Sequence, residues 1–363
     1  MALLVGPSVP RRLSPSRPFL AMAIQGPVRY GTGDWISCIK SLPTSRILRR
    51  TRLNILFFTV WAFILTALHK VAGFTWLQLP PSLTSVLGPT LSLLLVFRTN
   101  SSYDRFWEAR KSQSSMVYAC RNLAMHAYVH LPKSTWRELA TLLCTYALVQ
   151  KQHLQGVITD EELAPLFSSA EMVKDIQSRK NRPLHVIKLL EVLIHKSLSD
   201  KYKNVEAADF DPTMPKYIEK HMIEGLATLS AHLVTCERII KQPVPLSYTR
   251  HTSRFLSLFI TLLPFSLLSN GLGWLVVPIT TLITWSLVSI QEISHYVEEP
   301  FDASKQIIQL NSICSVVRSD VSEILDGVLE GAEMDRLEDN LLQETLRNSR
   351  AGDESRAGFY KKK

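Results

Sequence analysis

Three long stretches of the chain contain no Asp, Glu, Lys, Arg or His. They run from Leu53 to Leu68, from Val71 to Phe97 and from Phe255 to Ile290, and they are 16, 27 and 36 residues long. Because a helix needs about 20 apolar residues to cross about 30 Å of hydrocarbon, the longest stretch can hold two helices folded as a hairpin. The turn-forming residues at its middle are Ser269, Asn270, Gly271 and Gly273.

The second stretch is interrupted by Pro80 and Pro81, which suit a loop between two helices. The pattern therefore predicts an all-α integral membrane protein with four transmembrane helices, at about 53–74, 82–97, 255–269 and 273–291. The alternative is a large helical soluble protein with long buried helices, because individual apolar runs are short for a membrane. That alternative requires every charge-free stretch to lie in the core.

The region between the second and third spans, residues 98–250, has helical periodicity throughout. Leu139, Leu142, Leu143, Tyr146 and Val149, for example, recur at spacings of three and four, and no useful alternating β pattern occurs. We expect a helical bundle continuous with the membrane helices, which makes 46–300 the main domain. An amphipathic segment follows at 301–330, and a charged, disordered tail at 331–363.

Basic residues flank one end of each of the first three predicted spans. The opposite side carries only Lys70, so the positive-inside rule places both termini and residues 98–250 on the cytoplasm-equivalent face. The flanking basic residues are Arg46, Arg49, Arg50 and Arg52, then Arg98, Arg105, Arg110 and Lys111, and finally Lys241, Arg250 and Arg254.

The N-terminal segment, residues 1–45, has the composition of a targeting sequence. No acidic residue precedes Asp34, whereas Arg, Ser and Pro are frequent, and no continuous apolar run of secretory length is present. Such a composition is typical of an organellar transit peptide. The less favoured alternative is a disordered basic tail, in a chain whose net charge is +9.

The sequence contains no motif of enzyme chemistry that we can identify. It has no phosphate-binding Gly-rich loop, no nucleophile elbow and no closely spaced cysteine pair. His126 and His130 can share a helix face, and Glu298, Glu299 and Asp302 cluster after the fourth span, but structural roles are favoured for both groups over a metal site. We expect no catalytic residue, no metal, no cofactor and no nucleic-acid partner.

Three segments resemble the bestrophin family, and they are most similar to its bacterial and plant branch. They are FRTNSSYDRFWEARK from Phe97 to Lys111, CERIIKQPVPLSYTRH from Cys236 to His251, and EEPFD from Glu298 to Asp302. The first is the most specific, and the resemblance covers about 46–315. It implies a homopentameric, voltage-dependent anion channel with a central pore, which conducts chloride and other small monovalent anions and contacts membrane lipid.

Together with the transit-like N-terminus, the resemblance implies a multi-pass protein of the chloroplast thylakoid membrane with both termini in the stroma. Such a channel would pass anions from stroma to lumen and adjust the electrical and pH parts of the proton motive force. Two alternatives from other classes remain, an anion secondary transporter and a non-conducting membrane scaffold of the same fold. Four spans, no internal repeat and no ionisable residue within the charge-free stretches argue against a transporter.

Pro89, Leu93 and Phe97 fall at i, i+4 and i+8 on one helix face, and five copies would form three stacked rings. By resemblance they match the family's hydrophobic pore neck, in which a narrow apolar ring can gate by dewetting. Pro89 departs from the bulky aliphatic residue expected at the outermost ring. Thr90 and Ser92 add hydroxyl groups nearby. The alternative is that Leu93 and Phe97 pack between helices.

Arg98 and Arg105 follow the neck, and we expect their charge to raise the anion concentration at the inner mouth of the pore. On this hypothesis Arg98→Gln reduces anion current or selectivity. The aromatic residues of the same run, Tyr103, Phe106 and Trp107, are expected to lie in the core.

The acidic cluster departs from the animal branch of the family, in which a long acidic run helps to bind calcium. Here Asp302 is followed by Ala303, Ser304 and Lys305. We therefore predict that no calcium clasp forms and that a chelator leaves the current unchanged.

Overall fold

The computed structural model describes residues 42, 45–157, 159, 162, 163, 166, 167, 169–202 and 213–329, which all lie in one compact unit. All the secondary-structure elements assigned within this part of the chain are helices, as the all-α prediction requires. The transit-like segment falls almost wholly outside the described residues. The charged tail at 331–363 lies entirely outside them.

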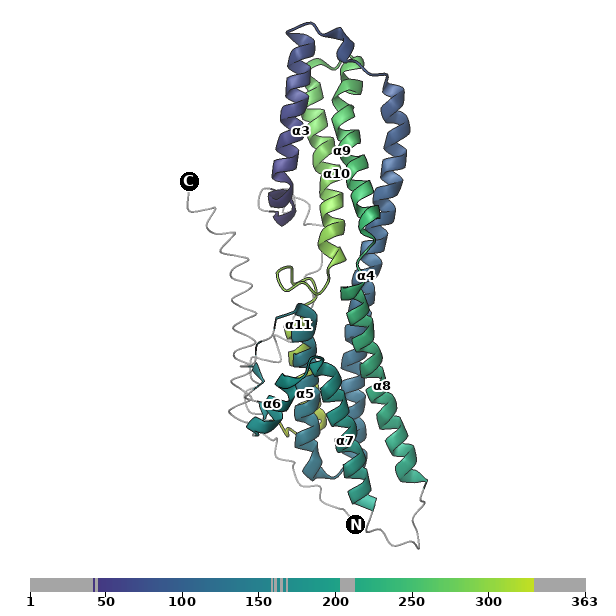
Figure 1. Cartoon of the computed structure of the whole chain (residues 1–363), viewed down its shortest axis with the longest axis vertical. Helices are drawn as coiled ribbons and strands as arrows, with labels where there is room; N and C mark the ends of the chain where they lie inside the picture. The colour runs from purple at the N-terminus through teal and green to yellow at the C-terminus, as the bar shows by residue number, and fades with distance from the viewer. Residues whose placement is uncertain are drawn as a thin grey trace, which may run out of the picture. The chain divides into compact units, whose positions relative to one another are not determined.

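Four of these helices are long and apolar enough to cross a membrane, the number that the sequence predicts. They are α3 (Arg46–Lys70), α4 (Pro81–His130), α9 (Leu246–Ser269) and α10 (Val276–Glu298). Helix α10 contacts the other three, and α9 also packs on α3 and α4 (Figure 1). Leu91 and Leu95 of α4 meet Leu256 and Ile260 of α9 in the apolar core between them.

The links between these helices follow from their turn residues. A short 3-10 helix, η3 (Thr75–Leu77), leads to Pro80, which is the N-cap of α4. Gly271 and Gly273, with φ of 73° and 58°, make the turn between α9 and the 3-10 helix η6 (Gly273–Leu275), which precedes α10. Positive φ is the conformation that glycine adopts without a steric penalty.

The second predicted span is only the first part of a much longer helix. Helix α4 continues without a break for 50 residues, and Pro89 lies inside it. It therefore runs from the group of apolar helices into the second group of helices (Figure 1). Likewise, α9 begins at Leu246, directly after its N-cap Pro245, nine residues before the predicted span.

The second group packs around the distal half of α4. It contains α5 (Lys133–Gln155), α6 (Ala170–Ser178), α7 (Arg182–Tyr202), α8 (Met214–Lys241) and α11 (Leu310–Ile324). Helix α5 is buried along most of its length, and the Tyr146 hydroxyl donates to the Leu229 carbonyl at 3.0 Å. This bundle fixes the direction in which α4 leaves the apolar helices.

Candidate functional site

The five predicted pore-facing residues of α4 all lie on its exposed side. Leu93 and Phe97 are 56% and 57% exposed, whereas Leu91 and Leu95 on the opposite side are 1% and 3% exposed. The other described helices therefore cover one side of α4 and leave an apolar stripe open. The predicted residues on that open side are Pro89, Thr90, Ser92, Leu93 and Phe97.

Two features of the backbone affect the upper part of this stripe. Pro89 has no N–H, so the carbonyl of Ser85 lacks its usual helical donor. The Thr90 hydroxyl donates to the carbonyl of Val86 at 3.3 Å. Thr90 therefore presents oxygen lone pairs, rather than a free proton, on the open side.

Arg98 lies on the covered side of α4. It is 3% exposed, and its Nε and Nη1 atoms have no hydrogen-bond partner among the described residues. The charges that act on it most strongly include those of Glu298 and Glu292 on α10. Its guanidinium is thus separated from the open stripe by the body of the helix.

Arg105 binds main-chain carbonyl groups rather than facing open space. Its Nη1 donates to the Gln242 carbonyl at 2.6 Å, its Nη2 to the Ile239 carbonyl, and its Nε to the Glu298 carbonyl at 3.3 Å. These carbonyls belong to the C-terminal ends of α8 and α10, where the helix dipole favours a cation. Arg105 therefore ties α4 to the ends of two other helices.

The aromatic residues near these arginines divide between core and surface. Phe106 is half-buried and packs on a cluster with Ala109 and Phe301. Tyr103 and Trp107 are exposed, and their rings stack with centroids 6.4 Å apart. The core expectation is therefore met by Phe106, but it is wrong for Tyr103 and Trp107 within the single chain.

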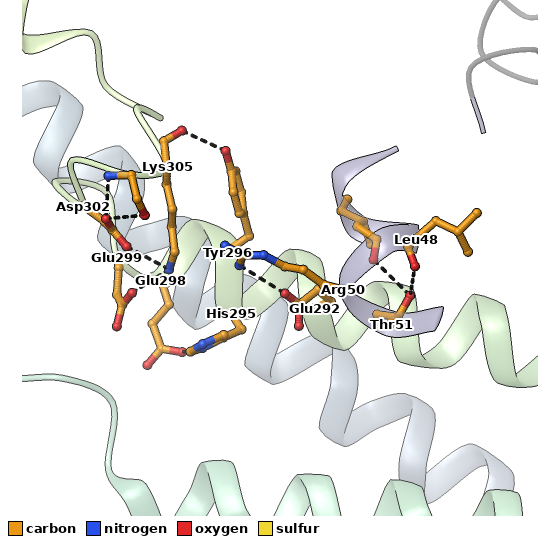
Figure 2. Close-up of polar contacts among 12 residues, drawn as sticks. Leu48, Arg50, Thr51, Glu292, His295, Tyr296, Glu298, Glu299, Asp302 and Lys305 are labelled. Atoms are coloured by element: carbon orange, nitrogen blue, oxygen red, sulfur yellow. Dashed lines mark hydrogen bonds and ion pairs between the residues drawn. The ribbon is translucent and has the colours of Figure 1, made fainter. Parts of the chain in front are cut away.

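The acidic cluster after α10 contains a buried lysine (Figure 2). The Lys305 side chain is 4% exposed, and its Nζ lies 2.5 Å from Oε2 of Glu299 and 3.8 Å from Oδ2 of Asp302. Burial acts to raise the pKa of Asp302, but hydrogen bonds from Ser304 and the charge of Lys305 hold it below its usual value. A single ammonium group therefore pairs with both carboxylates.

The same lysine is tied to the preceding helix. The Tyr296 hydroxyl donates to the Lys305 carbonyl at 2.9 Å, and Arg50 of α3 pairs with Glu292 at 3.3 Å (Figure 2).

No group of three metal-ligating side chains is found within the described residues. His126 and His130 instead stack with centroids 5.9 Å apart.

Two charged residues, Asp104 and Lys111, also lie on the open stripe, a position that was not predicted for either of them. Both are exposed, and they follow Phe97 at intervals of seven residues. Helical register alone would have found them, because seven residues are close to two turns.

Four apolar helices, one of which carries an open apolar stripe and continues into a polar bundle, define an integral membrane protein of helical type. The sequence matches the family described as Bacterial/Fungal Bestrophin protein over residues 28–323, and the chain belongs to the bestrophin family.

Related proteins agree with this assignment. The chain is 32% identical, over 67% of its length and 78% of the relative, to a voltage-dependent anion channel-forming protein of Nostoc. It is 28% identical to the chloroplastic voltage-dependent chloride channel 2 of Arabidopsis thaliana, over 80% of this chain and 68% of the relative. A mutant bacterial bestrophin homologue from Klebsiella pneumoniae shares the fold, with a TM-score of 0.68, 24% identity, and coverage of 78% and 100%.

Proposed function

We propose that the protein is a voltage-dependent anion channel that conducts chloride and other small monovalent anions. The observation that carries this proposal is the open apolar face of α4. Leu93 and Phe97 on this face remain more than half exposed, although α4 packs against other apolar helices on its opposite side. A membrane helix can place such a face against lipid, against another subunit or toward a pore. The names of the Nostoc and Arabidopsis relatives favour the pore.

The pore forms when five copies of the chain surround one axis. Pro89, Leu93 and Phe97 then make three successive rings of the neck, about 6 Å apart along α4. A narrow apolar neck lets anions pass without binding them tightly, and the edge of a Phe ring carries partial positive charge. Thr90 and Ser92 lie beside these rings.

In the proposed pore, Arg98 and Arg105 lie behind the stripe of residues that faces the pore. Their positive charges act on the anion only through the protein, because both side chains lie on the covered side of α4. We expect Arg98→Gln to reduce anion selectivity. The reduction should be smaller than that caused by removing an exposed positive charge at the same position along the pore.

The physiological setting that we propose is the chloroplast thylakoid membrane, with both termini and the polar helical bundle in the stroma. The basic flanks of the spans and the chloroplastic Arabidopsis relative support this orientation and location. Anion entry from stroma to lumen would lower the electrical part of the proton motive force and let the pH part grow.

A chloride-flux assay tests the proposal. Purified protein in liposomes should release chloride when valinomycin provides a potassium pathway, and should release little without it, because the current must be balanced. Release that needs no valinomycin would indicate electroneutral exchange, as expected for a secondary transporter. No release from correctly assembled protein would indicate a non-conducting scaffold.

A further inference from the structure

The open stripe of α4 continues beyond the neck with charged residues. Phe97, Asp104 and Lys111 are spaced by seven residues, and each step of seven turns the helix by only about 20° from the same direction. All three side chains are exposed. At 1.5 Å per residue, Asp104 lies about 10 Å and Lys111 about 21 Å beyond Phe97 along the helix axis.

The arginines of this region occupy a different side of the same helix. Arg98 and Arg105 follow Phe97 and Asp104 by one residue each, which is a rotation of about 100° toward the covered side. Arg98 is 3% exposed, and Arg105 donates to carbonyls of α8 and α10. The first exposed charge on the stripe after the neck is therefore the acid, Asp104.

The surroundings leave both charges of the stripe unneutralised. Asp104 forms no ion pair within 4 Å with any described residue, and the Nζ of Lys111 lies 5.7 Å from the centre of the Trp107 ring. The nearby Glu108 is not a competing charge, because it pairs with Arg238 of α8. Arg110 is exposed, but about 100° away from Lys111 around the helix.

We propose that Asp104 and Lys111 are opposing determinants of charge selectivity, which form an acidic ring followed by a basic ring on the inner side of the neck. The Asp104 ring repels anions as they approach Phe97, and the Lys111 ring attracts them to the mouth. This inference rests on the proposed pore of five subunits. It assigns charge selectivity to the exposed side of α4 and gives Arg98 and Arg105 a smaller part in it.

Coulomb's law gives the size of the expected effects. Five unit charges about 10 Å from an anion in water, screened with a Debye length of about 8 Å, change its occupancy of the neck by about threefold at 0.15 M salt. At 0.01 M salt, where the Debye length is about 30 Å, the factor becomes about tenfold. The more distant Lys111 ring gives about twofold at 0.01 M and almost nothing at 0.15 M.

The test is the chloride-to-potassium permeability ratio of the full chain in planar bilayers, from reversal potentials in KCl gradients at both salt levels. Because each ring changes chloride and potassium occupancy by the same factor in opposite directions, Asp104→Asn should raise the ratio by about a hundredfold at low salt and about ninefold at high salt, whereas Lys111→Gln should lower it about fourfold at low salt only. Asp104→Glu, which keeps the charge, should resemble the wild type. Glu171→Gln on α6 is the matched control, because Glu171 is also exposed but lies on another helix.

Two results would overturn this inference while leaving the channel intact. One is a conducting Asp104→Asn variant with the wild-type ratio at both salt levels. The other is a shift of the same sign in Asp104→Asn and Lys111→Gln. A wild-type protein that carries no current would instead contradict the proposed function, and the inference would fall with it.

Discussion

The contacts of Arg105 make a prediction that separates a structural role from an electrostatic one. Replacing Arg105 by Lys keeps the positive charge but loses the planar fork that reaches three carbonyl oxygens, whereas Met removes both. If the residue acts only through its charge, Lys should substitute for it. If it acts as a tie between α4, α8 and α10, both variants should be damaged.

The hydrogen bonds of Arg105 set the size of the expected loss in the free energy of unfolding. A hydrogen bond from a charged donor contributes about 1.5–3 kcal/mol, and less where water reaches it, as it does at the Gln242 carbonyl. A lysine ammonium in this position can reach one of the separated carbonyls. Two lost bonds correspond to about 3 kcal/mol for Arg105→Lys, and three to about 4 kcal/mol for Arg105→Met.

The assay is unfolding of the detergent-solubilised protein by denaturant, with chloride flux measured on the same preparations. Arg110→Lys is the control, because Arg110 is exposed on the same helix and forms no ion pair with another described residue. Arg105→Lys with wild-type stability, beside an Arg105→Met variant that is stable but has lost flux, would refute the structural role and restore the electrostatic one.

Three further predictions concern the polar bundle and the acidic cluster. Burial lowers the pKa of His232 to about 4 from its ordinary 6.5, so the unfolded chain binds this proton first as the pH falls. The stability that comes from neutral His232 is thus complete above about pH 6.5 and is lost toward pH 4. Between pH 7 and 5 we expect the free energy of unfolding by denaturant to fall by about 2 kcal/mol in the wild type and not in His232→Asn. An equal fall in both proteins would contradict the assignment. Lys305→Met should cost about 1–2 kcal/mol, because it leaves Glu299 and Asp302 without their ammonium, and a thermal midpoint equal to the wild type would contradict that role. A chelator should leave the wild-type current unchanged, and a current that falls on chelation and returns with calcium would contradict the prediction.

The number of apolar membrane helices could be predicted because lipid imposes a constraint that is local in sequence. A span must avoid charge over its whole length, so charge-free stretches mark it directly. The register of Leu93 and Phe97 on one face was equally local, since it follows from the helical repeat. The family could be recognised because its segments are continuous runs of residues.

The contacts of Arg105 and Lys305 could not be predicted, because their partners are distant in sequence or belong to the main chain. Arg105 binds carbonyls more than 130 residues away, and no side-chain pattern marks a carbonyl as an acceptor. The continuation of the second span as helix was predicted, but its full extent to His130 was not. Charge ends an apolar stretch without ending the helix, which continues through Arg98 as far as His130.

The exposure of Tyr103 and Trp107 shows a further limit of sequence patterns. Aromatic residues at helical spacing indicate a face that becomes buried, but they do not say whether the same chain or another copy buries it. In the single chain these two rings stack on one another and remain open. Burial of Tyr103 and Trp107 between subunits of an assembly would explain why these aromatic residues follow the spacing of a buried face.

The most direct test of the account is single-channel recording of the purified protein in planar bilayers under a chloride gradient. Phe97→Ala and Leu93→Ala should be recorded beside Phe57→Ala, which alters an equally apolar and exposed residue of α3. A pore neck on α4 predicts unitary currents that reverse near the chloride equilibrium potential, with amplitude or selectivity changed by the two α4 variants and not by the α3 variant. Wild-type currents that none of the three substitutions alters would contradict a neck on α4.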